Sequence, residues 1–146
     1  MTKIINFLFP CQQCCGVHIG LGLLRIAFGL LIVTHGWAKF QGFDAMSSAF
    51  PDPFGIGSAA SLSLAIFAEL FCGLALVAGF LTRLAIIPLV VTMLVAFFQA
   101  HGGSFEQGGE LAFTYLVAFV ALFFTGPGRL SVDSLIGQRF SGSCKA

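Results

Sequence analysis

Four apolar stretches of this sequence are long enough, or nearly so, to cross a lipid bilayer. A membrane-spanning helix needs roughly 20 predominantly apolar residues. The stretches that qualify are 19–40, 60–80, 84–100 and 110–125. The last two are at the short limit, which a bilayer accommodates by local thinning. Because lipid offers the backbone no hydrogen-bond partners, each stretch satisfies its own polar groups as a helix. The sequence therefore predicts an all-α, polytopic membrane protein built as a four-transmembrane-helix bundle.

The composition agrees with a membrane protein and excludes several other classes. Hydrophobic residues make up 58% of the 146 residues and charged residues only 9%, whereas soluble domains carry nearer a quarter. The net charge of +1 and the absence of a basic run give no reason to expect a nucleic-acid partner. We expect one membrane domain, 1–146, with the lipid bilayer as its principal partner and homo-oligomerisation left open.

The cations are distributed unevenly between the predicted loops. One side of the bundle receives Lys3, Arg83, Arg129, Arg139 and Lys145, and the other receives Asp44, Asp52 and Glu106. Lys39, at the outer end of the first helix, is the exception. Because loops rich in lysine and arginine stay in the cytoplasm, both termini are predicted to be cytoplasmic.

Two further signals concern helix ends. Pro88 is expected in the first turn of the third span, where its missing N–H costs nothing. Residues 130–140 are typical of a short, peripheral amphipathic helix, capped by Ser131 or Asp133.

Ionisable side chains inside the first two spans share faces. Five residues of the first helix follow spacings of three and four, which places them within a narrow arc: Arg25, Phe28, Ile32, His35 and Lys39. The second helix carries a similar face: Ala65, Glu69, Cys72, Gly73, Leu76 and Arg83. Glu69 is close to mid-span, the depth at which a carboxylate is most costly. These faces are predicted to look into the bundle.

Polar residues of the last two spans are expected at the same outer level. Gln99 and His101 end the third span, and Glu110 begins a predicted inward face that continues through Thr114, Val117 and Ala121. Together with the first two helices this predicts an outer-half polar pocket lined by a set of seven: Arg25, His35, Lys39, Glu69, Gln99, His101 and Glu110. Glu69 and His35 are the candidates for proton exchange. The plainer alternative is a set of structural ion pairs, such as Arg25–Glu69 and Lys39–Glu110.

The cysteines give a weak signal for metal binding. Cys11 and Cys14 form a C-x-x-C that His18 follows, so these three are candidate ligands. A c-type haem requires His directly after the second Cys, and Cys15 occupies that position. Free thiols in a reducing cytoplasm are the simpler interpretation of the segment, and no covalently bound cofactor is expected.

From His35-Gly36-Trp37-Ala38-Lys39-Phe40 onward the sequence resembles the DoxX family of small membrane proteins. The resemblance includes Leu24-Arg25, then Glu69, Gly73 and Gly79, then Leu81-Thr82-Arg83. It continues through His101, Gly108-Gly109-Glu110, Gly126-Pro127-Gly128-Arg129 and Asp133. It implies a four-helix protein of the bacterial inner membrane. The family takes its name from a subunit of a thiosulfate:quinone oxidoreductase, which implies association with redox enzymes.

Three functional hypotheses follow. The first is a redox-associated protein that binds a quinone or similar small molecule in the outer-half pocket, with electrons supplied by a partner protein or by the quinone itself. The second is a non-catalytic subunit that anchors or assembles a partner oxidoreductase. The third is a small-solute carrier, for which four helices offer little room. The sequence leaves open whether the protein is an enzyme.

Overall fold

The computed structural model describes residues 15–140, without the side chains at 15, 106–107 and 137–140. The elements in this part of the chain are helices. Three of them are long and apolar enough to cross a membrane: Gly16–Gln41, Ser58–Ala78 and Thr82–Ala100, with mean hydropathies of 2.0, 2.1 and 2.0. A fourth apolar helix, α7 (Glu110–Thr125), is shorter, with 16 residues. The predicted all-helical, polytopic membrane fold is confirmed.

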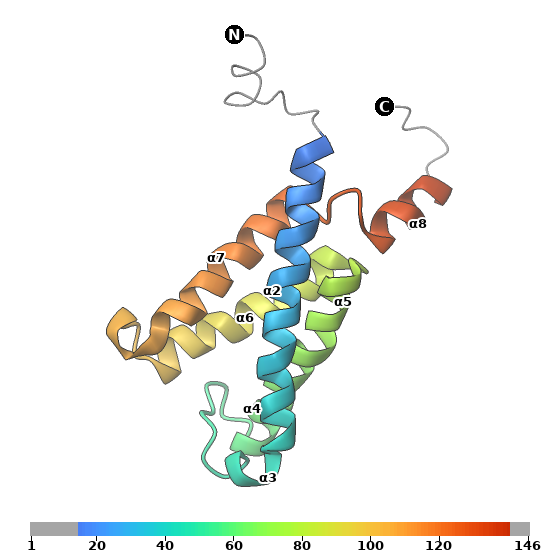
Figure 1. The fold of residues 1–146 in the computed structure, drawn as a ribbon. Coiled ribbons are helices and arrows are strands. Elements are labelled where there is room, and N and C mark those ends of the chain that lie inside the picture. The colour runs from blue at the N-terminus through green and yellow to red at the C-terminus, as the bar shows by residue number, and fades with distance from the viewer. Residues whose placement is uncertain (1–14, 141–146) are drawn as a thin grey trace.

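The first half of the chain forms a long helix and an interrupted helix that returns beside it (Figure 1). Helix α2 (Cys15–Gln41) runs the length of the molecule and is followed by one short helix, α3 (Phe43–Met46). The returning helix is built from three consecutive segments: α4 (Ser58–Ile66), the π-helix η1 (Phe67–Cys72) and α5 (Gly73–Ala78).

The second half forms a hairpin that leans away from α2 (Figure 1). Its first arm is α6 (Thr82–Val95) with the π-helix η2 (Ala96–Ala100). Its second arm is the π-helix η3 (Phe105–Gly109) with α7, which packs along α6. A last helix, α8 (Val132–Phe140), projects to the side of the bundle.

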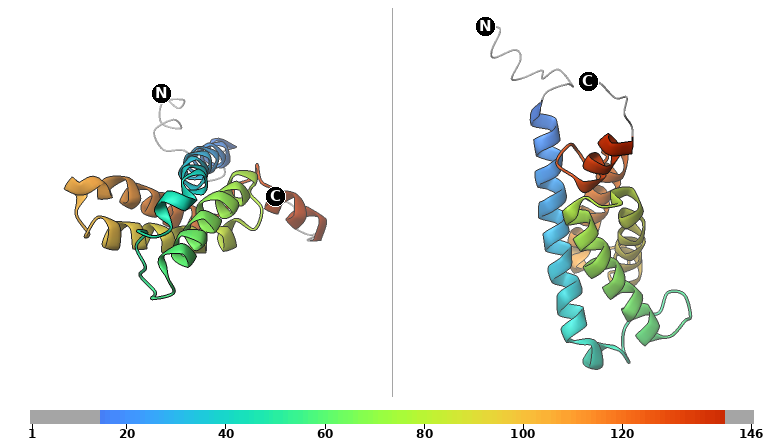
Figure 2. Two further views of the ribbon diagram at one scale, coloured as in Figure 1. Left: turned by 90° about the horizontal axis from the view of Figure 1, so that it is seen from below. Right: turned by 90° about the vertical axis from the view of Figure 1, so that its right-hand side faces the viewer.

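The bundle has two ends with different contents, visible in the right view of Figure 2. The start of α2, the turn between α5 and α6, and α8 lie at one end, which we call the terminal end. The connection between α2 and α4 and the loop between η2 and η3 lie toward the other, which we call the loop end.

The core and the lipid-facing surface are both apolar. Buried side chains from all four long helices form one cluster, which includes Ile32, Leu76, Ile86, Leu89 and Phe119. Large hydrophobic side chains also cover the outside; Phe124 is 77% exposed and Leu23 64%. A soluble protein would not expose so many, so this surface is suited to acyl chains.

Glycines allow the first two membrane helices to approach closely. A Cβ at Gly29 would lie 2.7 Å from the Val77 side chain, and one at Gly73 would lie 2.9 Å from the Val33 side chain. Any larger residue at these positions would separate α2 from α5. Small residues commonly serve this purpose in membranes, because packing between helices replaces the hydrophobic drive available in water.

Two expectations about local structure were wrong. Pro88 lies inside α6, not in its first turn, because the helix begins at Thr82. The predicted inward face of the fourth span was also wrong, since Glu110, Thr114, Val117 and Ala121 are all exposed. The buried face of α7 consists instead of Ala112, Tyr115, Ala118, Phe119 and Leu122.

Of the two candidates for the cap of α8, Ser131 is the capping residue. Its hydroxyl oxygen accepts the Ser134 N–H at 3.1 Å.

Candidate functional site

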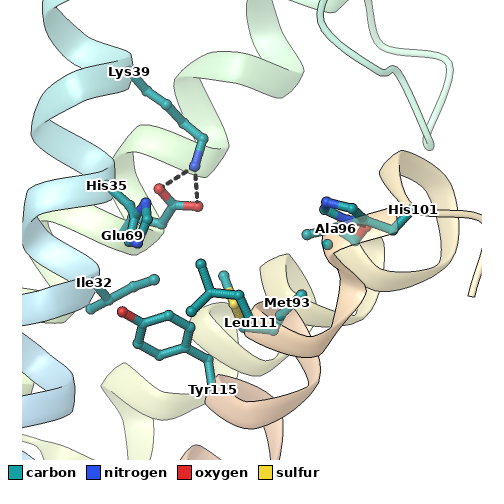
Figure 3. Close-up of a pocket in the computed structure, with 11 residues that line it drawn as sticks. Ile32, His35, Lys39, Glu69, Met93, Ala96, His101, Leu111 and Tyr115 are labelled. Carbon is teal, nitrogen blue, oxygen red and sulfur yellow. Dashed lines mark hydrogen bonds and ion pairs between the residues drawn. The ribbon is translucent and has the colours of Figure 1, made fainter. Parts of the chain in front are cut away.

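A cavity of about 130 Å³ lies between the helices on the loop-end side of the core. Residues of α2, η1, α6, η2, η3 and α7 line it, together with His101 from the connection between η2 and η3 (Figure 3). The lining residues are Ile32, His35, Lys39, Glu69, Met93, Ala96, His101, Gly108, Leu111, Ala112 and Tyr115. Four of the seven residues predicted for a pocket thus meet around one cavity.

The sequence of α2 explains why one side of this helix faces the cavity. Ile32, His35 and Lys39 follow one another at spacings of three and four. Gly36, on the same side, lies against η1: a Cβ there would be 2.7 Å from the Leu70 nitrogen and 2.9 Å from the Glu69 Cβ. Because Gly36 has no side chain, the backbone that carries Glu69 can lie directly against α2.

Glu69 forms an ion pair with Lys39 across the two helices. The lysine Nζ donates to both carboxylate oxygens, with the contact to Oε1 at 2.6 Å. Glu69 is 2% exposed, whereas Lys39 is 27% exposed. Neither ion pair suggested by the sequence, Arg25–Glu69 or Lys39–Glu110, is the one that forms. The buried carboxylate and its partly exposed lysine partner both border the cavity.

His35 and Tyr115 form the next part of the wall. Their rings meet edge to face with centroids 5.9 Å apart. Tyr115 is 4% exposed, and its hydroxyl points toward the side of the cavity that holds Glu69 (Figure 3). Within residues 15–140 this hydroxyl has no hydrogen-bond partner. It is a buried donor available to a ligand.

His101 faces the same cavity from the opposite wall (Figure 3). Its Nδ1 lies 2.8 Å from the Ala96 carbonyl oxygen. Because a carbonyl oxygen only accepts, Nδ1 is the donor in this contact, and the tautomer that donates from Nδ1 has Nε2 as an acceptor. Two polar groups thus face each other across the cavity. The Lys39 ammonium, paired with Glu69, lies on one wall, and the His101 imidazole lies on the other.

Three π-helical segments border the cavity. Glu69 belongs to η1, Ala96 to η2 and Gly108 to η3. A π-turn inserts an extra residue into a helix and redirects the side chains near it, and such turns are frequent at functional sites. The wider turn of η1 helps to aim Glu69 between α2 and the cavity.

Arg25 does not line the cavity, although it was predicted to. It lies toward the terminal end, 2% exposed, where its Nη2 donates to the Leu130 carbonyl oxygen at 2.6 Å. Asp133 lies near enough to interact electrostatically. On a helix that rises 1.5 Å per residue, Arg25 is two to three turns from His35, too far to share a small cavity.

Asp133 connects the start of α8 to the start of α6. Its carboxylate accepts the N–H groups of Leu81 and Thr82 at 2.7 and 2.8 Å. Burial opposes ionisation, but these backbone N–H groups and the charge of Arg25 lower the pKa of Asp133 below its ordinary value. The carboxylate therefore satisfies two free N–H groups of a helix start.

Gln99 and Glu110 also lie outside the cavity, and both residues are exposed. The sequence missed Tyr115 and Met93, which do line it. A signal for Tyr115 was present: it is the single tyrosine of the chain, near the middle of a mostly apolar helix. Ala112, Tyr115 and Phe119 follow one another at spacings of three and four, so they share one face of the helix, and this face is buried.

The metal-site candidates are not brought together in the described residues. Cys11 and Cys14 lie outside them, and within residues 15–140 no group of three His, Cys, Asp or Glu side chains could hold a metal ion. Cys72 is buried as a free thiol in the apolar core.

The cavity combines donors and acceptors with apolar walls. Lys39 and Tyr115 offer N–H and O–H donors, Glu69 and His101 offer acceptors, and Ile32, Met93 and Leu111 are apolar. In another protein an apolar cavity of about 150 Å³ holds one benzene molecule, so the volume here suits a single six-membered ring. Such a site can bind a small planar molecule with polar atoms at its edges.

Comparisons with known proteins agree with this architecture. The sequence model of the DoxX family matches residues 20–102. The chain is similar to the "Inner membrane protein YqjF" of Escherichia coli, with 33% identity over 84% of this chain and 95% of that protein. It is also similar to the "Uncharacterized membrane protein Rv3486" of Mycobacterium tuberculosis, with 27% identity over 80% of each chain. No solved structure matches the chain.

Proposed function

Because the chain belongs to the DoxX family and is a multi-pass inner-membrane protein, we propose that its cavity binds the ring of a quinone or of a similar small molecule taken from the bilayer. The observation that carries this proposal is the buried Glu69–Lys39 pair, which borders a cavity of one-ring size. The ring fills the apolar space, and its oxygen atoms replace water at the polar walls.

The polar groups suit the two oxygens of such a ring. The Tyr115 hydroxyl and the Lys39 ammonium are donors to a carbonyl oxygen on one side. On the opposite side Nε2 of His101 is an acceptor for the hydroxyl of the reduced form. A site with both kinds of group holds the oxidised and the reduced ring alike.

Proton exchange is assigned to Glu69, with His35 beside it. A quinone that gains two electrons also takes up two protons. A carboxyl group and an imidazole can each take up a proton from water and pass it on to a ring oxygen. Lys39 would release Glu69 when a ligand oxygen takes the ammonium as its own partner. The electrons come from a partner protein or from the quinone pool, so this role fits a redox-associated subunit.

Equilibrium binding of a short-chain quinone to the purified protein in nanodiscs tests the proposal. Wild type is expected to saturate, and Glu69→Gln is expected to weaken binding at least about tenfold, which corresponds to roughly 1.4 kcal/mol. Glu110→Gln is the matched control, because the same change is made at an exposed carboxylate outside the cavity. No saturable binding to wild type, or equal losses in both variants, would reject the proposal.

We also assign the terminal end to the cytoplasm. Exposed Arg83 and Arg129 lie there, whereas exposed Asp44 lies toward the loop end, as the positive-inside rule requires. A reporter that fluoresces only in the cytoplasm, fused after residue 146, is expected to be fluorescent. A dark fusion that is nonetheless produced in full would reverse the assignment.

A further inference from the structure

Two arginines at the terminal end form no ion pair with any side chain that the structure describes. Arg83, at the start of α6, and Arg129, in the connection between α7 and α8, are both exposed. Among the side chains that the structure describes, Lys39 and Glu69 form the sole ion pair. Asp133, at the start of α8, is already engaged by the backbone N–H groups of Leu81 and Thr82 and interacts electrostatically with Arg25.

The two arginines belong to one region of the surface. A Cβ added to Gly126 would lie 3.9 Å from Nη2 of Arg83, so this guanidinium lies beside the end of α7. Arg129 follows Gly126 by three residues in the same connection. The connection is held in place, since the Arg25 side chain donates to Leu130 and a Cβ at Gly128 would lie 3.2 Å from the His18 carbonyl oxygen.

Exposed apolar side chains surround both arginines. Phe80, Leu81 and Leu84 flank Arg83, with exposures of 45%, 51% and 61%. Leu130, next to Arg129, is 61% exposed, and Leu135 and Ile136 of α8 are 64% and 40% exposed. Water would make this arrangement costly, whereas acyl chains stabilise it. The two guanidinium groups therefore lie at the depth where acyl chains give way to headgroups.

We propose that Arg83 and Arg129 bind the phosphate of an anionic phospholipid, with its acyl chains on Phe80, Leu84 and Leu130. Guanidinium groups bind phosphate through paired N–H donors, and basic sites between membrane helices bind lipid headgroups in this way. The site is separate from the cavity, from which it is divided by the apolar core. It would anchor the terminal end of the bundle and α8 at one leaflet.

Lipid selectivity measured by native mass spectrometry tests this proposal. Wild type in mixed micelles is expected to retain phosphatidylglycerol about tenfold more strongly than phosphatidylcholine of the same chain length. The double variant Arg83→Gln/Arg129→Gln is expected to lose this preference to within twofold. The variant Arg83→Lys/Arg129→Lys should keep part of it, because charge remains without the paired donors.

Several outcomes would overturn the proposal. Equal retention of both lipids by wild type would do so, as would an undiminished preference in the double glutamine variant. Competition by inorganic phosphate at micromolar concentration would show a site for a soluble anion instead. Thermal unfolding in phosphatidylcholine alone should be the same for wild type and variants, which separates lost binding from lost folding.

Discussion

Arg25 and Glu69 are buried to the same extent, each 2% exposed, yet the protein surrounds them differently. Arg25 lies between α2 and the connection that follows α7, where its side-chain partner is a backbone carbonyl oxygen. Glu69 is paired with Lys39, a long and partly exposed side chain at the border of a cavity. We call these regions the Arg25 junction and the Glu69 cavity.

The difference indicates which buried charge is structural. A partner in the main chain cannot leave without unfolding the local backbone, so the Arg25 junction fixes the fold. A partner at the end of a flexible lysine can turn to another group at small cost. Burial alone does not separate the two cases; the identity of the partner and the presence of space beside it do.

The largest effect is expected from Gly79→Ala in the Arg25 junction. Gly79 has φ +70°, and a Cβ there would overlap the Arg25 guanidinium and lie 2.6 Å from the Ser131 Cβ. The backbone strain and the overlap together should lower the free energy of unfolding by about 4 kcal/mol. Denaturant titration in detergent micelles measures it.

Gly55→Ala is the matched control for this prediction. Gly55 has φ +67°, but nothing lies within 4 Å of its Cβ position. The backbone cost alone should be about 1 kcal/mol. Similar losses for the two variants would show that the junction is not tightly packed.

Lys39→Met should have the next largest effect, because it leaves the Glu69 carboxylate buried without a partner. A loss of about 3 kcal/mol is expected near neutral pH. The double variant Lys39→Met/Glu69→Gln should recover most of it, since the uncompensated charge is gone. A double-mutant cycle on unfolding free energies measures the coupling. Additive losses would contradict the pairing of these two side chains.

Arg25→Met should lower the free energy of unfolding by about 2 kcal/mol, because the Leu130 carbonyl oxygen loses its charged donor. Ligand binding in the cavity should remain unchanged, since Arg25 does not line it. Measuring both the free energy of unfolding and ligand binding therefore distinguishes the Arg25 junction from the Glu69 cavity. If Arg25→Met weakened quinone binding as much as Glu69→Gln, the distinction between junction and cavity would fail.

The smallest effect is expected from Asp133→Asn, on how the free energy of unfolding depends on pH. The pKa of Asp133 is lower in the folded protein than its ordinary value of 3.8. The ionised carboxylate therefore stabilises the folded state above pH 3.8, and this stabilisation is lost as the pH falls through the folded pKa. Asp133→Asn should cost about 1 kcal/mol at pH 6, and the gap to wild type should close below pH 4. Unfolding measured between pH 3 and 7 tests this.

Asp52 provides the counterpart outside both regions. The Gly57 N–H is the main cause of its lowered pKa, with help from Ser61 and Ile56. Asp52→Asn should therefore also reduce the loss of unfolding free energy as the pH falls.

The outcome that would contradict the prediction for Asp133 concerns the difference in unfolding free energy between wild type and Asp133→Asn. If that difference stayed constant down to pH 3, the Asp133 carboxylate would not be the group that titrates.

The faces of the first two helices followed from the sequence, whereas the face of α7 did not. On α2 and the returning helix, charged or polar residues mark the inner side, and lipid excludes them from the outer side. On α7 one charge, Glu110, stands at the end of the helix, where the aqueous boundary already accommodates it. The buried face there consists of Ala112, Tyr115 and Phe119, which differ little in polarity from their exposed neighbours.

The sequence by itself determined that the chain is a helical membrane protein and that Arg25 and Glu69 are turned away from lipid into the bundle. The cost of polar groups in lipid decides both, and that cost is set by each residue alone. Only the tertiary structure decided which charges meet. Pairing depends on helix depth, on the close approach at Gly36 and on the π-turn at Glu69, and these bring Lys39 to Glu69 and leave Arg25 to the backbone of Leu130.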